Sequence, residues 1–167
     1  MTRRHSLATG LLVAMLGVTG LSACDASGSI SVGAGSGASE GATARASSLW
    51  ANRTDFVGDN SKIIALVRDA GIAAPGTYTI SLGTSTRPYA VTVHLDKPAK
   101  PAGTTDFTSP ATILLGAVGN LDEVRVVGGS RDFSLTSGQA STALGYDVKL
   151  LGRDESRLRH YVEGLAD

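Results

Sequence analysis

The densest group of polar side chains in the 167-residue chain is Asp59-Asn60-Ser61-Lys62, directly after Val57-Gly58. Backbone N–H groups at a helix start, together with a lysine, can hold a phosphate or a carboxylate. The same residue types are also ordinary helix caps, because Asp, Asn and Ser accept hydrogen bonds from the first free amides. A phosphate-binding loop would need more glycines and a preceding strand. The pattern therefore favours a cap, and leaves Asp59, Asn60, Ser61 and Lys62 as a candidate anion-binding site.

Other side chains that perform chemistry are few and scattered. His94 falls on the polar side of an alternating segment, and His160 has no second ligand at the spacing of a zinc helix. No G-x-S-x-G elbow and no Cys–His arrangement is present in the sequence. We therefore expect no metal, no cofactor and no catalytic residue. The alternative from another functional class is a cell-envelope hydrolase, in which Asp59, Asn60, Ser61 and His94 converge in one pocket.

The single cysteine, Cys24, follows a charged start and an uncharged, apolar run over residues 7–23. This order is typical of a signal peptide, and the run is too short and too rich in glycine for a membrane span. The segment Leu21-Ser22-Ala23-Cys24 resembles a bacterial lipobox. The resemblance implies cleavage before Cys24 and attachment of a diacylglyceryl group to its thiol. Two acyl chains would hold the protein stably at a membrane.

The charge balance excludes some partners. The chain has 15 basic and 15 acidic residues, and a cleaved leader would remove Arg3 and Arg4. The slightly acidic remainder has no clustered basic face for nucleic acid. The Arg3-Arg4 pair leaves open whether export uses the general or the twin-arginine route.

Three segments follow from composition. Residues 1–23 are the predicted signal peptide, and residues 24–47 carry the lipid and form a Gly/Ala/Ser-rich flexible tether. Residues 48–167 are the predicted folded domain, which is large enough to form its own core.

Within this domain, apolar spacing predicts a helix up to Gly71, with Asp59, Asn60 or Ser61 as its cap. Two alternating segments, 77–84 and 87–96, predict a β-hairpin, and 97–106 is a predicted loop. A helix over 109–120 should begin with Ser109 as cap, and a third strand should span 122–127. Helices over 137–144 and 153–165 complete the chain, and Leu158, Tyr161, Val162 and Leu165 should be buried. The order predicts one small α+β domain, with an antiparallel sheet of about three strands and helices on one face.

Three spaced motifs carry a second resemblance: FVGDNSK at 56–62, RPYAVTV at 87–93 and NLDEVRV at 120–126. Together they resemble a small extracytoplasmic domain family of unknown function from Gram-positive bacteria, whose members include lipoproteins. The resemblance implies sensing or binding near the membrane and brings no catalytic residues.

The sequence thus predicts a lipid-anchored, non-enzymatic binding or sensory module on the outer face of the membrane. Its partners would be the membrane, through the diacylglyceryl anchor at Cys24, and a membrane protein or cell-envelope component. Besides the hydrolase, a structural or inhibitory envelope protein is a further alternative.

Overall fold

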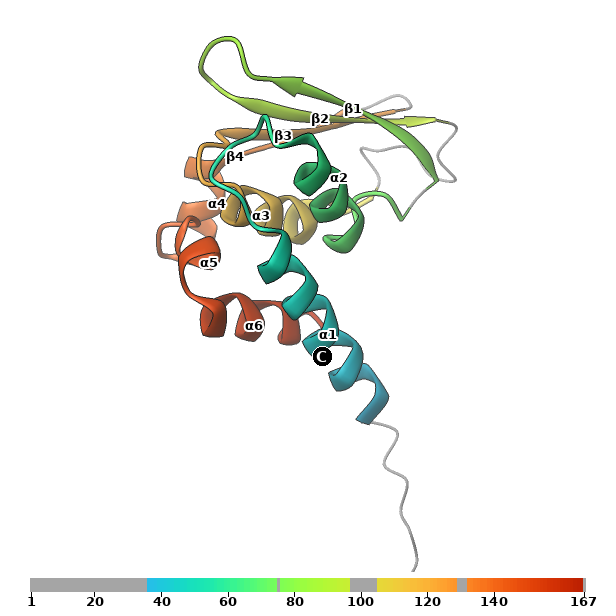
Figure 1. The fold of residues 1–167 in the computed structure, drawn as a ribbon, viewed down its shortest axis with the longest axis vertical. Coiled ribbons are helices and arrows are strands. Elements are labelled where there is room, and N and C mark those ends of the chain that lie inside the picture. Colours follow the sequence, from blue (N-terminus) through green and yellow to red (C-terminus); the bar gives the residue numbers. More distant parts are fainter. Residues whose placement is uncertain (1–35, 75, 97–104, 129–131, 167) are drawn as a thin grey trace, which may run out of the picture. The chain divides into compact units, whose positions relative to one another are not determined.

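The structure is a computed structural model that describes residues 36–74, 76–96, 105–128 and 132–166 (Figure 1). By its internal contacts the chain divides into residues 1–32 and 33–167, and everything described belongs to the second unit. The predicted signal peptide, Cys24 and most of the predicted 97–106 loop therefore lie outside the described residues.

Among the described residues, four strands form one sheet in the order β1-β2-β3-β4. They are β1 (Thr77–Gly83), β2 (Ala90–Asp96), β3 (Glu123–Val127) and β4 (Phe133–Thr136). The predicted hairpin is confirmed as the antiparallel pair β1–β2, but β3 runs parallel to β2 and only β4 restores the antiparallel direction. The prediction of an antiparallel sheet of about three strands is thus only roughly matched, because the described sheet is mixed and has four strands. A helical crossover returns the chain to the same end of the sheet, and the four residues of β4 are too few for a visible alternation.

In the described part of the chain six helices accompany the sheet: α1 (Ser36–Asn52), α2 (Asn60–Asp69), α3 (Thr108–Ala117), α4 (Ser137–Leu144), α5 (Leu150–Arg153) and α6 (Glu155–Glu163). Figure 1 shows α2 and α3 on one side of the sheet, and α3 and α4 contact β3 and β4. That side of the sheet is buried at Val91, Val93, Val124 and Val126, whereas Arg125 on the other side is exposed. The α+β class is confirmed, and the helices form a second layer in which α1 packs on α2 and α6.

The predicted tether extends too far toward the C-terminus, because residues 36–47 belong to α1. Ala42 and Ala46 are buried and Leu49 is fully inaccessible. Arg45 donates hydrogen bonds from Nε and Nη2 to the carbonyl oxygens of Asp69 and Ala70, at 2.8 and 2.6 Å. Composition suggested a coil, but alanine is the best helix former, and packing of this small-residue face on α6 and α2 gives the segment a core to join.

The central helix α3 is buried at every position from Ala111 to Ala117. A helix that is apolar all round has no amphipathic edge to mark its start, and it begins at Thr108 rather than after the predicted Ser109 cap. Its first free amide, that of Thr108, donates to the Asp106 carboxylate at 2.8 Å.

Two other predicted helices are present. Helix α4 begins and ends where expected, with Thr136 and Gln139 in a reciprocal cap and Gly145 in the left-handed conformation. The predicted 153–165 helix is confirmed as the shorter α6, which begins after Asp154 because the Asp154 carboxylate accepts from two of its backbone amides. Leu165 lies beyond α6 and is 41% exposed, so the prediction that it is buried was wrong.

Helices α3 and α5 approach through two glycines, which yields a stability prediction. A Cβ atom added to Gly152 would collide with the carbonyl oxygen of Gly116. We expect Gly152→Ala to lower the free energy of unfolding by about 1–3 kcal/mol through overpacking. The matched control is Gly138→Ala in α4, where the added methyl meets nothing within 4 Å and should stabilise by about 0.5–1 kcal/mol. Urea unfolding of both variants measures the difference, and equal effects would contradict the close approach of the two helices.

Candidate functional site

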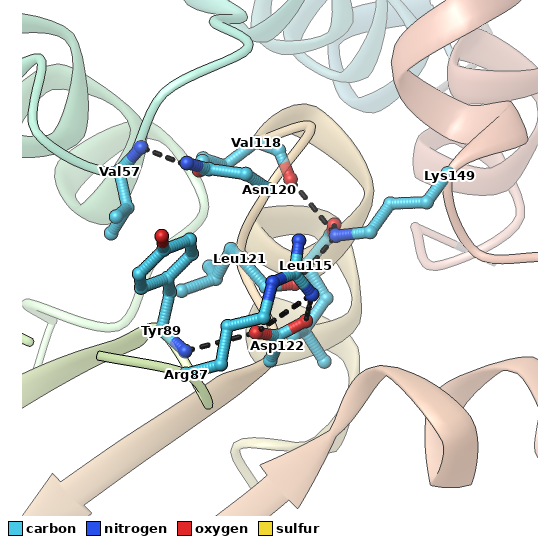
Figure 2. A network of polar contacts seen from close by, with 9 residues as sticks. All are labelled: Val57, Arg87, Tyr89, Leu115, Val118, Asn120, Leu121, Asp122 and Lys149. Carbon is cyan, nitrogen blue, oxygen red and sulfur yellow. Dashed lines mark hydrogen bonds and ion pairs between the residues drawn. The ribbon is translucent and has the colours of Figure 1, made fainter. Parts of the chain in front are cut away.

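The three sequence motifs meet at residues 120–122, just after α3 (Figure 2). The Asn120 side-chain oxygen accepts a hydrogen bond from the Val57 amide at 2.7 Å. The Asp122 carboxylate accepts from the Tyr89 amide at 2.9 Å and pairs with the exposed Arg87 guanidinium at 3.2 Å. These polar contacts join the three motifs, and we call the group of Val57, Arg87, Tyr89, Asn120 and Asp122 the polar latch. We assign its polar residues a role in holding the fold together.

The loop between α1 and α2 docks on the same region through its backbone. The Thr54 amide donates to the Ala117 carbonyl at 3.0 Å, and the Gly119 amide donates to the Thr54 carbonyl at 2.8 Å. The Asn120 amide donates to the Asp55 carbonyl at 3.1 Å. A Cβ on Gly119 would lie only 3.1 Å from the Asp55 carboxylate. These contacts fix Asp55 beside the end of α3.

Three carbonyl groups in the last turn of α3 and just after it accept hydrogen bonds from one side chain, Lys149 (Figure 2). Its ammonium donates to the carbonyl oxygens of Leu115, Val118 and Leu121 at 2.7, 2.9 and 2.6 Å. A helix leaves its last carbonyls without internal partners, and a cation there also complements the helix dipole. Lys149 is thus the C-terminal cap of α3, supplied from a segment close to α5.

Burial lowers the pKa of Lys149 from 10.5 to about 8, although the nearby carboxylates of Asp122 and Asp147 act in the opposite direction. Desolvation disfavours the charged ammonium. The three carbonyl oxygens are therefore needed to keep this cation in a largely buried position.

A cavity of about 400 Å³ opens beside this cap. Its lining includes four basic residues (Arg53, Lys62, Lys149 and Arg153) and one carboxylate, that of Asp55. The volume lies within the range of sites for small molecules. The cavity combines residues from the end of α1, the following loop, α2 and α5, and the capped end of α3 forms part of its wall.

Two of the cations are held in place by the α1–α2 connection. The Arg53 guanidinium lies 3.6 Å from the Trp50 ring centroid and donates to the Trp50 carbonyl at 2.7 Å. The Lys62 ammonium donates to the Arg53 carbonyl at 3.1 Å. A guanidinium stacked on an indole is stabilised by a cation–π interaction. The cavity therefore has a prepositioned basic wall.

Comparison with known protein families places a large part of this chain in one of them. A protein-family model described as Domain of unknown function (DUF4825) matches residues 49–137, more than half of the chain. The chain belongs to this family. No curated protein and no solved structure matches. The match contains the whole polar latch of the DUF4825 domain, together with Arg53 and Lys62, but ends before Lys149 and Arg153.

The predicted anion site of the DUF4825 domain is only partly assembled. Asp59 caps α2 by accepting from the Lys62 amide at 3.5 Å, as the cap interpretation expected. Asn60 and Ser61 are exposed and are not part of the cavity lining. Lys62 alone of the four enters the cavity, by folding its side chain back toward Arg53.

His94 lies on another element with another partner. It is on the open face of the sheet in β2, where its ring Nε2 is 3.1 Å from the Ser81 hydroxyl. Asp59 instead contacts α2 and the preceding loop. The convergence of Asp59, Asn60, Ser61 and His94 that the hydrolase alternative needs is not found in the described part of the chain.

Sequence reasoning missed three basic residues of the cavity: Arg53, Lys149 and Arg153. They come from two separate places in the chain: Arg53 follows α1, whereas Lys149 and Arg153 are four residues apart at either end of the stretch Lys149-Leu150-Leu151-Gly152-Arg153. Lys149 follows the left-handed Gly145 by four residues. This position in the sequence does not indicate that its side chain caps the distant helix α3. Only the tertiary structure brings these charges together.

The role of Lys149 as a cap predicts the effect of removing it. Lys149→Met should lower the free energy of unfolding by about 2–4 kcal/mol, because buried carbonyls would lose charged donors. Lys62→Met is the matched control: it removes the same charge and one carbonyl contact, and should cost about 1 kcal/mol or less. Urea unfolding at pH 7 gives both values.

The difference in the free energy of unfolding between the wild type and Lys149→Met should depend on pH. The pKa of Lys149 is about 8 in the folded chain and about 10.4 when unfolded. The unfolded chain therefore binds more protons between these values, and the stability of the wild type relative to Lys149→Met should rise with pH across that window. A flat difference would contradict the burial of this ammonium.

Proposed function

We propose that this DUF4825 protein is a lipid-anchored binding or sensory module on the outer face of the cytoplasmic membrane, and that its ligand occupies the cavity beside α3. The observation that carries the proposal is a formed cavity of about 400 Å³ whose wall consists of fixed polar and charged groups. Sites for small molecules are usually such clefts with a few oriented polar groups. The partner would be a membrane protein or a cell-envelope component within reach of the anchor.

The proposed anchor rests on the lipobox-like segment Leu21-Ser22-Ala23-Cys24. The described helices include none with the length and apolar character of a membrane span. Since α1 begins at Ser36, the segment between Cys24 and the domain is shorter than composition suggested. An anchor at Cys24 would accordingly confine the domain close to the lipid surface.

Among the alternatives, a structural or inhibitory role finds one supporting feature. Phe56, next to the latch residue Val57, is 67% exposed and borders the cavity. An exposed aromatic side chain is a common anchor in protein interfaces. We favour the binding module because the same residue also belongs to the wall of a cavity. The hydrolase is not proposed, since its residues lie on separate elements with separate partners.

Anchoring predicts a covalent modification at one residue. Mass spectrometry of the protein from its native membrane should find a lipidated N-terminus at Cys24 and no residues before it. Cys24→Ser should abolish both lipidation and cleavage, because only a thiol can form the thioether. Ser27→Ala, which lies outside the lipobox, is the control and should be processed normally. An unmodified thiol behind an intact leader would refute the anchor.

Binding at the cavity predicts site-specific crosslinking in living cells. A photo-crosslinking phenylalanine analogue at position 56, where the native side chain is exposed, should capture a reproducible partner or ligand. The same analogue at the exposed position Ala143 in α4, outside the cavity lining, should not. A protein that stays uncrosslinked at position 56, or gives the same products at both positions, would contradict the proposal.

A further inference from the structure

Within the described residues the positive charge of the cavity lining is only partly balanced, by Asp55 in the lining and by Asp122 and Asp147 near Lys149. Ion pairs in the described part of the chain join Arg68–Asp69, Arg87–Asp122, Arg125–Glu123, Arg157–Asp154 and Arg159–Glu155. None of them uses Arg53, Lys62, Lys149 or Arg153, and Asp55 is the one carboxylate of the lining. Four cations that share a wall without paired anions produce a positive potential, which attracts a negatively charged ligand.

The contacts of these cations with the protein leave their charge intact. Lys62 and Lys149 donate to backbone carbonyls, which are neutral acceptors. Lys149 moreover covers the negative end of the α3 dipole, which would otherwise repel an anion from the cavity. The capping interaction that stabilises the fold thus also makes the cavity suitable for an anion.

The two arginines retain the donors that such a ligand needs. Of its five N–H groups, the Arg53 guanidinium uses one for the Trp50 carbonyl, and its ring stacking fixes the plane of the group. No side-chain hydrogen bond of Arg153 is found within the described residues, and this residue is exposed at the cavity. Guanidinium groups bind phosphate oxygens in pairs, with defined geometry.

We propose that the cavity binds the phosphate group of a hydroxyl-bearing phosphate ester. This inference rests on the proposed function and names its ligand class. A phosphate has more charge and more acceptor oxygens than a carboxylate, which suits four cations. About 400 Å³ is on the order of ten times the volume of a water molecule in the liquid, so an organic part fits as well. Asp55 is placed to accept a hydrogen bond from a hydroxyl group, and Phe56 borders the organic part.

Such a group has two sources at a membrane: a soluble sugar or glycerol phosphate, or the headgroup of a phosphatidylglycerol lipid. Both present a phosphate group next to a hydroxyl group, although the soluble monoester carries up to two negative charges and the phosphodiester of the lipid carries one. A test therefore uses one soluble probe and one lipid probe, and the protein itself supplies the reporter. Trp50 is the only tryptophan of the chain, and Arg53 is stacked on it.

The full-length protein, in nanodiscs of neutral phosphatidylcholine, is titrated with glycerol 3-phosphate while Trp50 fluorescence is recorded. We expect a saturable change that neither glycerol nor acetate produces. Arg153→Gln should weaken binding about tenfold or more, the effect of losing a charged hydrogen-bond pair. Arg159→Gln removes the same charge from the exposed face of α6 and should stay within about twofold. Lys62→Gln is a second cavity variant.

In the lipid arm, phosphatidylglycerol replaces part of the phosphatidylcholine. Competition with the soluble probe assigns the headgroup as the source, and an unchanged affinity assigns the soluble ester. The absence of saturable binding, or equal effects of Arg153→Gln and Arg159→Gln, overturns the phosphate assignment. If crosslinking at position 56 still captures a partner, the binding function stands and only the ligand class fails. If that crosslinking fails too, both proposals fall.

Discussion

The end of helix α3 is buried, and its last carbonyl groups have no hydrogen-bond donors within the helix. The rest of the domain has to supply those donors. Inside a protein, an unpaired carbonyl costs as much as a lost hydrogen bond. The chain meets this need twice: the Thr54 amide donates to Ala117, and the Lys149 ammonium donates to three further carbonyls. Both donors come from segments far from α3 in the sequence. Closing this helix end therefore forces the α1–α2 loop and the start of α5 to lie beside it.

The composition of the cavity follows from that constraint. A buried ammonium is tolerated only with good acceptors, and its charge remains because the acceptors are neutral carbonyls. The α1–α2 loop that docks on the same end brings Arg53 and Lys62, and the short helix α5 brings Arg153. Four cations thus gather where backbone geometry required one. Stability of the helix end and the positive charge of the cavity share a cause.

Helix ends were predictable from sequence where a capping residue or a glycine marks them. Asp59 and Gly71 bound α2, and Gly145 ends α4, because caps and left-handed glycines act over a few residues. The parallel pairing of β2 with β3 and the helical state of residues 36–47 were not predictable, since both depend on partners far along the chain. The cavity was not predictable from sequence for the same reason. Of its four basic residues only Lys62 belongs to a polar motif that was singled out, and the four-residue spacing of Lys149 and Arg153 does not show that they lie beside Arg53 and Lys62.

The boundary of the family match separates two parts of this design. The latch at Asn120 and Asp122 lies wholly within residues 49–137, as do Arg53 and Lys62, while Lys149 and Arg153 lie beyond them. A ligand that contacts both pairs of cations would bridge the family core and α5 across the glycine contact of Gly116 with Gly152. Its binding free energy would then be available to hold α5 against α3, because a ligand stabilises the arrangement to which it binds. The proposed sensory role would need such a link between an occupied site and the packing of one element, and the position of Lys149 and Arg153 at the two ends of α5 would make that element the link.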